Sequence, residues 1–256
     1  MPTFSLLRTL PAIAAAGIML FAGASAANAQ QSKEDIEKIV REYLLKNPEI
    51  IQEAIMELRK KQEMAETTAR TKALQSYKKD IFESPRDVVL GNPKGNVTLV
   101  EFFDYNCGYC KRAVNDVAEL LKSDPNLKIV LKELPILSEG SVEAARVAVA
   151  VRMQDPSKYW AFHRALMSAK GEANGAQALA AAKTAGLDIE RIKKDVSNPE
   201  VDATLHGVQE LAKALAISGT PSYVLGDELI PGALPHDRLA VAIAAVRKCG
   251  KVNCPN

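Results

Sequence analysis

The chain has 256 residues, of which 47% are hydrophobic and 25% are charged, and 33 Lys and Arg residues nearly balance 31 Asp and Glu residues. This balance of charge gives no reason to expect a nucleic acid or an anionic membrane surface as the target. The length suffices for one sizeable core plus an accessory segment, and the scarcity of aromatic residues beside abundant alanine favours a helix-rich protein.

Residues 1–29 have the pattern of a secretory signal peptide. Arg8 supplies the basic start, an apolar run extends from Leu10 to Ala24, and Ala27-Asn28-Ala29 offers small residues at the cleavage point. A retained membrane anchor is the alternative, but the apolar run is short and contains Pro11 and two glycines. We therefore expect export to an oxidising compartment in which disulfides persist, the periplasm if the cell is a diderm bacterium.

Residues 30–80 are expected to form an N-terminal helical segment. Apolar residues recur at helical spacing on both sides of Asn47-Pro48. They are Ile36, Ile39, Val40, Tyr43 and Leu44 before it, and Ile50, Ile51, Ala54, Ile55 and Leu58 after it. Stripes this narrow need a partner surface, either the rest of this chain or the same segment of another subunit. We expect the second case, a homo-oligomer that is a dimer or a trimer.

Residues 81–256 are expected to form a separate α/β domain that opens with a β-α-β unit. Turn signals flank a short strand at 88–90. The nearly continuous apolar run from Val97 to Tyr105 is typical of a strand buried on both faces. A helical pattern begins near Lys111, and the segment from Leu127 to Leu134 predicts the next strand.

The sequence Cys107-Gly108-Tyr109-Cys110 lies at the junction between that strand and that helix. Two cysteines separated by two residues can close a small, reversible disulfide. At a helix start the first thiol faces unpaired backbone N–H groups and the positive end of the helix dipole, which favour the thiolate. The thiolate is the species that attacks a disulfide, so this segment predicts thiol-disulfide exchange.

The rest of the domain is expected to be a helical block, about 136–216, followed by a hairpin and a last helix. Ser222 to Leu225 and Glu228 to Pro231 flank a Gly-Asp turn, which is a hairpin signal. The last helix is expected from about His236 to Lys248. Cys249 and Cys254 follow it, and we expect them to form a structural disulfide that clips the C-terminal tail.

The order β-α-β, helical block, β-β-α resembles the thioredoxin fold with the helical insertion of the DsbA family of secreted thiol-disulfide oxidoreductases. The resemblance covers roughly residues 85–250. It depends on Glu-Phe-Phe-Asp-Tyr-x-Cys-Gly-Tyr-Cys-Lys at 101–111 and on Gly-Thr-Pro-Ser-Tyr at 219–223. With its N-terminal helical extension the chain is most similar to the ScsC-like or Com-like subgroup.

The resemblance implies a role for particular residues. Cys107 is expected to be the exposed nucleophile and Cys110 the resolving thiol. Glu101 matches a buried acid that assists proton transfer from Cys110. Pro221 matches the family's cis-proline, which helps to hold extended substrate, and Thr220 offers it backbone and hydroxyl groups. These two residues, with Gly108 and Tyr109 of the dipeptide between the cysteines, form the expected substrate-binding set.

The dipeptide departs from the family's strong oxidants, which have Pro-His where this chain has Gly108-Tyr109. The absence of a histidine beside the thiolate argues for a weaker oxidant. Gly-Tyr, with Thr220 before the proline, resembles the secreted disulfide isomerases. Oxidation, reduction and isomerisation therefore all remain open at this point.

Other interpretations of the cysteines are weaker. A zinc site built from both cysteine pairs is one, but secretion favours disulfides, and no metal or organic cofactor is expected. A second redox pair at Cys249 and Cys254 lacks the strand-to-helix context. His163 is expected to serve helix packing or to lie at the surface.

The sequence thus predicts an enzyme that forms, reduces or isomerises disulfides in exported cysteine-containing proteins and is reset by a membrane redox partner. The alternative is an oligomeric periplasmic chaperone or surface antigen whose thioredoxin fold serves only for binding.

Overall fold

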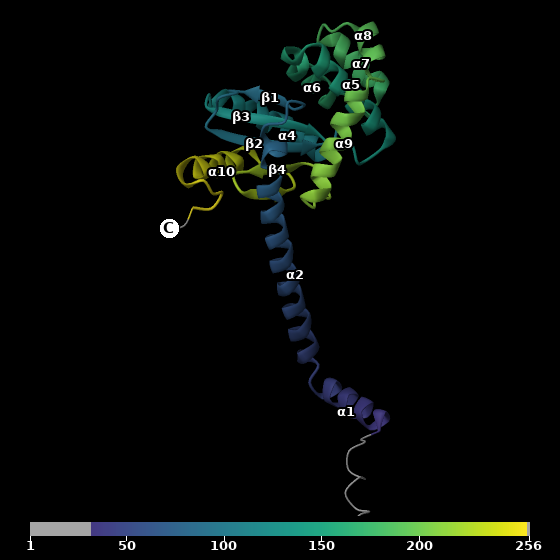
Figure 1. The fold of residues 1–256 in the computed structure, drawn as a ribbon, viewed down its shortest axis with the longest axis vertical. Coiled ribbons are helices and arrows are strands. Elements are labelled where there is room, and N and C mark those ends of the chain that lie inside the picture. The colour runs from purple at the N-terminus through teal and green to yellow at the C-terminus, as the bar shows by residue number, and fades with distance from the viewer. Residues whose placement is uncertain (1–31, 255–256) are drawn as a thin grey trace, which may run out of the picture. The chain divides into compact units, whose positions relative to one another are not determined.

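The computed structural model describes residues 32–254, so the signal peptide predicted at 1–29 lies outside the described part of the chain. The helices and strands, shown in Figure 1, follow in chain order. They are α1 (Lys33–Lys46), α2 (Glu49–Ser76), α3 (Lys78–Phe82), β1 (Val88–Gly91), β2 (Val97–Phe103), α4 (Gly108–Ser123), β3 (Leu127–Glu133), α5 (Glu139–Gln154), the 3₁₀ turn η1 (Pro156–Lys158), α6 (Tyr159–Met167), α7 (Gly175–Thr184), α8 (Ile189–Asp195), α9 (Pro199–Ala214), β4 (Ser222–Leu225), β5 (Glu228–Pro231) and α10 (His236–Cys249).

The chain divides into two compact units between Gln62 and Glu63, and α2 contributes residues to both. The second unit therefore begins before the boundary at residue 81 that the sequence suggests. The reason is that Leu74 of α2 and Ile81 of α3 are buried in a core cluster of this second unit.

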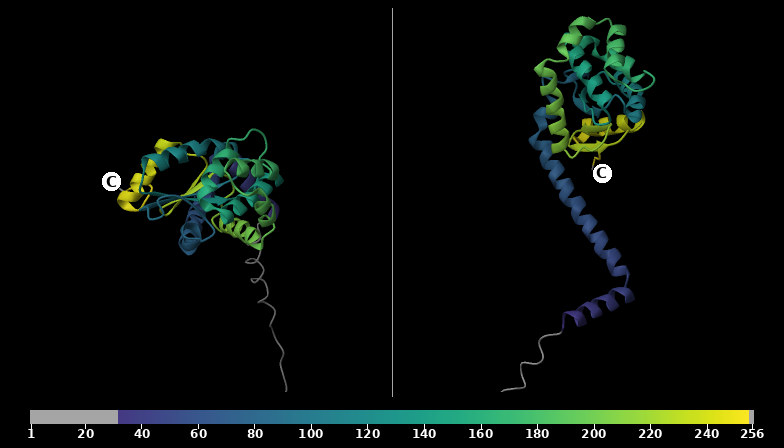
Figure 2. Two further views of the ribbon diagram at one scale, coloured as in Figure 1. Left: turned by 90° about the horizontal axis from the view of Figure 1, so that it is seen from above. Right: turned by 90° about the vertical axis from the view of Figure 1, so that its right-hand side faces the viewer.

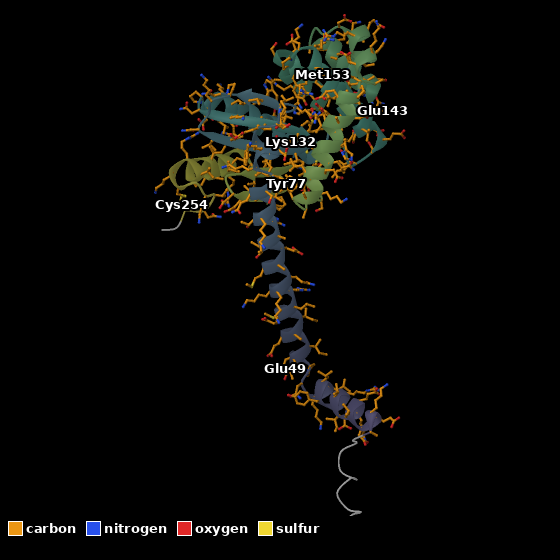
Figure 3. The ribbon with its side chains drawn as sticks, in the orientation of Figure 1. Glu49, Tyr77, Lys132, Glu143, Met153 and Cys254 are labelled. Carbon is orange, nitrogen blue, oxygen red and sulfur yellow. A yellow bond between two sulfur atoms is a disulfide. The ribbon has the colours of Figure 1, made fainter. Side chains whose placement is uncertain are left out.

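The first unit contains α1 and the beginning of α2. Ser32 caps α1 because its hydroxyl accepts a hydrogen bond from the backbone N–H of Asp35. No residue of α1 is buried, and side chains project outward around α2 (Figure 3). Most of the large apolar residues in this unit are exposed, from 45% at Ile55 to 73% at Leu45, whereas Leu44 and Ile50 are half-buried. The expected helices are thus present, and their apolar stripes are mostly exposed.

A five-stranded sheet in the order β1-β3-β2-β4-β5 organises the second unit. β2 and β3 pair in parallel, and the other pairs are antiparallel. This is the arrangement predicted from the β-α-β unit and the hairpin: a mixed sheet with a helical block. Figures 1 and 2 show the block α5–α8 at one end of the sheet, apart from α10.

Each face of the sheet has its own core. The larger cluster joins one face to α4, α10 and the helical block, and it includes Leu99, Ile129, Val117, Leu239 and Ile243. The smaller cluster joins the other face to α3 and α9 through Phe102, Val130, Ile81, Val208 and Leu211. Burying β2 on both faces explains why its sequence is apolar without alternation.

A buried ion pair fixes α3 to the sheet. The ammonium of Lys132 on β3 (labelled in Figure 3) donates to a carboxylate oxygen of Asp87 at 2.6 Å and to the backbone carbonyl of Asp80 at 2.8 Å. Only 1% of the Lys132 side chain and 5% of the Asp87 side chain are exposed. A charge this deeply buried needs such a partner, so the connection between α3 and β1 is held firmly against the strand.

Candidate active site: a cysteine pair at the start of α4

Cys107 and Cys110 are free thiols in the structure and lie where β2 gives way to α4. Cys107 is the N-cap of α4, and its sulfur accepts a hydrogen bond from the backbone N–H of Cys110 at 3.3 Å. The helix starts at Gly108, three residues before the start near Lys111 that the sequence suggests, because Cys107 acts as the cap. A sulfur at this position receives both an N–H donor and the positive end of the helix dipole.

The loop that precedes β4 covers the sulfur of Cys107. The Thr220–Pro221 peptide bond is cis, and the carbonyl oxygen of Thr220 lies 3.1 Å from the Cys107 sulfur. Cys107 is only 5% exposed, which differs from the exposed nucleophile implied by the resemblance. The cause is this contact with Thr220, whose carbonyl oxygen lies against the sulfur.

The dipeptide between the cysteines forms the open side of the site. Tyr109 is 60% exposed, and the guanidinium carbon of Arg112 lies 4.4 Å from the centre of its ring. This cation–π contact holds the aromatic ring beside the cysteine pair. A methyl group added at Gly108 would meet no atom within 4 Å. The surface over Gly108 and Tyr109 is therefore open.

Cys110 is buried, and Glu101 lies behind it on β2. Burial raises the pKa of the Cys110 thiol, and the charges of Glu101 and Cys107 raise it further. Glu101 is 4% exposed, and burial raises its pKa to about 8, with a smaller contribution from the negative charge of Asp116. A carboxyl group that titrates near neutral pH beside a thiol is suited to take up or return the proton of that thiol.

Two polar residues just before Cys107 were not predicted from the sequence. The buried carboxylate of Asp104 accepts hydrogen bonds from the backbone N–H groups of Asn106, Ile136 and Leu137 and from the hydroxyl of Ser141. This arrangement ties the cysteine loop to the start of the helical block. It also presents Ile136 and Leu137, which are 43% and 52% exposed, at the surface.

Asn106 makes the second connection to the helical block. Its side-chain amide donates to the carbonyl of Ala173 at 2.9 Å and accepts from the N–H of Ala173 at 2.6 Å. Lys111 adds a hydrogen bond from its ammonium to the carbonyl of Gly171. The sequence signal that could have indicated these two residues is the change from an apolar run to Asp-x-Asn directly before the first cysteine.

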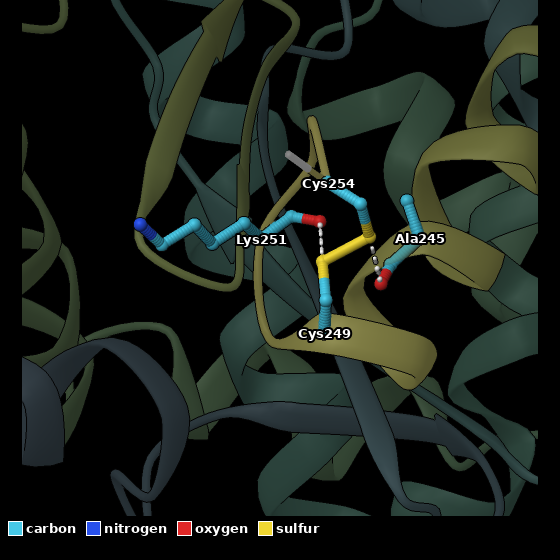
Figure 4. The surroundings of a disulfide bond; sticks show 4 residues. All are labelled: Ala245, Cys249, Lys251 and Cys254. Carbon is cyan, nitrogen blue, oxygen red and sulfur yellow. Dashed lines mark hydrogen bonds between the residues drawn. A yellow bond between two sulfur atoms is a disulfide. The ribbon is translucent and has the colours of Figure 1, made fainter. Parts of the chain in front are cut away.

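The second cysteine pair forms a disulfide after α10 (Figure 4). The Cα atoms of Cys249 and Cys254 are 5.9 Å apart. The sulfur of Cys254 lies 3.4 Å from the carbonyl oxygen of Ala245 on α10, so the bond holds the tail against its helix. The structure thus places the two cysteine pairs in separate settings and does not bring them together as one site.

His163 is buried and belongs to the core. Its ring lies edge-on to Phe103 and stacks on Trp160, and its Nδ1 atom is 3.4 Å from the hydroxyl of Tyr105. Burial lowers its pKa to about 3, which keeps the ring neutral. Of the two positions expected for His163, helix packing and the surface, the structure shows helix packing.

Residues 32–254 contain no group of three or more His, Cys, Asp or Glu side chains arranged to hold a metal ion. Within the same range, no helix is both long enough and apolar enough to cross a membrane.

Comparison with known families agrees with this geometry. The model of the DSBA-like thioredoxin domain matches residues 98–244, more than half of the chain. The chain belongs to the DSBA-like thioredoxin family. A second model, the copper resistance protein ScsC N-terminal domain, matches residues 33–65, which include α1 and the first part of α2.

Solved structures of DSBA-like relatives are similar over most of their length. A thioredoxin-like oxidoreductase from Silicibacter pomeroyi is 47% identical, with a TM-score of 0.64, over 67% of this chain and 98% of that one. The thiol-disulfide exchange protein alpha-DsbA2 from Wolbachia pipientis is 30% identical, with a TM-score of 0.65, over 70% and 97%. ScsC of Proteus mirabilis in a transitional conformation is 30% identical, with a TM-score of 0.64, over 84% and 96%.

Curated relatives include longer proteins. This chain matches a Na⁺/H⁺ antiporter of Salinispora arenicola with 26% identity over 62% of its own length, and it spans 24% of the length of that protein. It also matches disulfide bond formation protein D of Bacillus subtilis with 24% identity over 60% of this chain and 74% of that protein.

Proposed function

We propose that this protein is a thiol-disulfide oxidoreductase that uses Cys107 and Cys110 on cysteine-containing exported proteins. The observation that carries the proposal is the position of the Cys107 sulfur. It caps α4, lies 3.1 Å from the Thr220 carbonyl oxygen, and has a second thiol one helical turn further on. Family membership supports a general role in disulfide exchange.

The exchange proceeds in two steps. The Cys107 thiolate attacks one sulfur of a substrate disulfide. This attack releases the other substrate sulfur as a thiol and leaves a mixed disulfide at Cys107. Either Cys110 or another substrate thiol then attacks the mixed disulfide. Cys110 must lose its proton to do so, and Glu101 is placed to accept it. Thr220 and Pro221 border the sulfur and hold the extended substrate.

Reduction and isomerisation fit the site better than strong oxidation. Tyr109 is exposed and is not a basic side chain, and its neighbour Gly108 supplies no side chain, so the dipeptide adds no cationic group to stabilise a thiolate at Cys107. A less stabilised thiolate makes the disulfide form a weaker oxidant. Isomerisation also requires a reduced nucleophile that can attack one substrate repeatedly.

Location and partners follow from the expected signal peptide. Export to the periplasm places the protein among client proteins whose cysteines are being paired. A related solved structure is described as a periplasmic thioredoxin-like protein from Salmonella enterica serovar Typhimurium. A membrane redox partner then restores the Cys107–Cys110 pair to its working state.

The N-terminal helices are proposed to assemble several copies of the chain. Ile36, Ile39, Val40 and Tyr43 are at least half exposed, which leaves an apolar stripe on α1 without a cover among the described residues of its unit. The cost of exposing such a stripe favours association with an equivalent stripe. Several active sites held near one substrate would raise the effective concentration of thiols.

Reactivation of scrambled ribonuclease and reduction of insulin test the proposed activity. Wild-type protein is expected to catalyse both, and Cys107→Ala is expected to catalyse neither. The double variant Cys249→Ser/Cys254→Ser is the matched control and should retain both activities. Equal activity of Cys107→Ala and wild type would favour the alternative, a chaperone or surface antigen that uses the fold only for binding.

Sedimentation tests the assembly separately. The mature chain is expected to sediment as a dimer or trimer at micromolar concentration, and a variant lacking residues 30–62 as a monomer. That deletion ends where the second compact unit begins, so it should still reduce insulin while losing isomerase activity. A monomeric full-length chain would contradict the assembly and leave the proposed chemistry intact.

A further inference from the structure

Tyr223 on β4 lies directly opposite Glu101 on β2. The two residues are Cα partners in the antiparallel pair, so their side chains point to the same face of the sheet. Both residues are buried, and Tyr223 shares its core cluster with Cys110 of α4. The phenol is thus packed among the groups that protonate and deprotonate the resolving thiol.

The hydroxyl of Tyr223 is buried and has no hydrogen-bond partner among the described residues. A buried hydroxyl without a partner destabilises a folded protein, and such atoms are rare. Phenylalanine would fill the same apolar space without this cost. An unpaired hydroxyl in the dithiol state is explained if its partner is the Glu101 carboxylate, which forms only when Glu101 loses its own proton and becomes able to accept one.

The ionisable groups around Glu101 come from three elements. α4 supplies Cys110 and Asp116, and β4 supplies Tyr223. α10 begins at His236, whose backbone N–H donates to a carboxylate oxygen of Asp116 at 3.1 Å. On β3, the Cα partner of Glu101 is the apolar Leu131.

The charges of these groups decide which of them can donate. Burial and the nearby negative charges of Glu101 and Cys110 raise the pKa of Tyr223, so its hydroxyl keeps its proton at neutral pH. Tyr223 is therefore a permanent donor beside two groups that become anions. A donor such as Tyr223 favours the ionised form of Glu101. Asp116 has the opposite effect, because its negative charge disfavours ionisation of Glu101.

We propose that Tyr223 is a positioning residue for disulfide exchange: its hydroxyl donates a hydrogen bond to the Glu101 carboxylate and so keeps Glu101 ready to take the proton of Cys110. The proposal rests on the proposed function above. In the step concerned, the Cys110 proton passes to Glu101 and the Cys110 sulfur bonds to the Cys107 sulfur. The bond from Cys107 to the substrate sulfur breaks, and the substrate leaves with the electron pair as a thiolate.

The test uses the reduced mature protein and Ellman's reagent in a stopped-flow spectrometer. Attack by Cys107 releases the first thionitrobenzoate, and attack by Cys110 on the mixed disulfide releases the second. The rate of the second release is measured between about pH 5 and about pH 10. Tyr223→Phe removes only the donor and is expected to move the midpoint of this profile up by about one pH unit. The first release should keep its wild-type profile.

Three further variants make the assignment specific. Asp116→Asn removes a negative charge near Glu101 and should move the midpoint down, opposite to Tyr223→Phe. Glu101→Gln should remove the Glu101 titration and leave only the rise in rate from direct ionisation of Cys110 at higher pH, and adding Tyr223→Phe should not shift this remaining rise. Tyr159→Phe removes another buried hydroxyl, one bonded to Tyr105 and Glu133, and should leave the midpoint unchanged.

The outcomes separate this inference from the proposed function. Absence of both releases in the wild-type protein would overturn the redox role of the pair itself. Two normal releases with the same midpoint in Tyr223→Phe as in Tyr159→Phe would overturn the role of Tyr223 alone. A shift that persists in the Glu101→Gln background would show that Tyr223 does not act through Glu101, which also overturns the proposal.

Discussion

The two cysteine pairs lie at opposite ends of helices. Cys107 caps the N-terminus of α4, where backbone N–H groups point at its sulfur, and the pair is free. Cys249 is the last residue of α10, where the helix exposes carbonyl groups, and it is bonded to Cys254. An N-terminus favours a negatively charged sulfur and a C-terminus disfavours it. The two settings therefore favour a reactive thiolate in one place and a stable disulfide in the other.

The surroundings of the two pairs strengthen the contrast. Behind Cys110 lies a buried carboxyl group, Glu101, that titrates near neutral pH, and above Cys107 lies the Thr220 carbonyl. Cys249 is exposed and has the backbone of its own tail as its neighbour. The two pairs thus differ in their position on a helix and in their access to a proton acceptor as well as in the spacing between the cysteines.

Removal of Cys110 should have the largest effect. In Cys110→Ala the thiol that resolves mixed disulfides is missing, so complexes joined through Cys107 to exported proteins should accumulate on non-reducing gels. The double variant Cys249→Ser/Cys254→Ser should accumulate none. Equal trapping by the two variants would remove the functional distinction between the pairs.

Alkylation should separate the two thiols of the reactive pair. Burial raises the pKa of Cys110, whereas Cys107 receives an N–H donor at the helix start. Iodoacetamide at pH 7 should therefore modify Cys107 more than about tenfold faster than Cys110. Mass spectrometry of peptides from briefly labelled, reduced protein measures the ratio. Faster labelling of Cys110 would reverse the assignment of nucleophile and resolving thiol.

Neutralising Glu101 should stabilise the reduced protein. The pKa of Glu101 is about 8 in the fold and 4.5 as its ordinary value, so the folded state binds the extra proton between these pH values. The stability that this group contributes to the fold is complete below about pH 4.5, and it falls as the pH rises towards 8. Glu101→Gln should remove this slope and gain on the order of 3 kcal/mol at pH 7, while slowing exchange. Urea unfolding at several pH values measures it, and an unchanged slope would contradict a buried, protonated Glu101.

Removal of the second pair should have the smallest effect. Cys249 and Cys254 close a short loop, with a sequence separation of 5. The double serine variant should lose about 2 kcal/mol of unfolding free energy because the unfolded chain gains freedom. Thermal melting of the variant beside the wild type, with Cys107 and Cys110 in the same redox state in both, measures this loss. A fall in insulin reduction beyond that explained by unfolding would indicate that this pair also takes part in exchange.

Local signals predicted most of the fold. The predicted helical block is present, and Pro, Gly and Asn residues separate its helices at Asp155-Pro156, Gly186 and Asn198-Pro199. The apolar run at 97–105 predicted β2, although the strand ends at Phe103 because Asp104 turns to bind the next loop. The apolar stripes of residues 33–58 predicted helices. Such a pattern along the chain does not identify the surface that covers the stripes.

The supporting residues of the site could not be predicted because their partners are distant in sequence. Asp104 meets Ser141 across 37 positions, and Asn106 meets Ala173 across 67. Tyr223 meets Glu101 only because β2 and β4 pair in one register. No periodicity or spacing connects such positions. The cysteine pair was predictable because its chemistry depends on a junction between a strand and a helix that are adjacent in sequence.

Redox equilibration of the mature protein tests the central claim most directly. The protein is equilibrated with glutathione buffers of graded potential, the free thiols are trapped with acid and alkylated, and each cysteine is quantified by mass spectrometry. We predict that Cys107 and Cys110 titrate together as one two-electron couple at a potential below the value of about −120 mV for DsbA. Cys249 and Cys254 should stay bonded throughout. A pair at Cys107 and Cys110 that never forms a disulfide, or a titration confined to Cys249 and Cys254, would contradict the account.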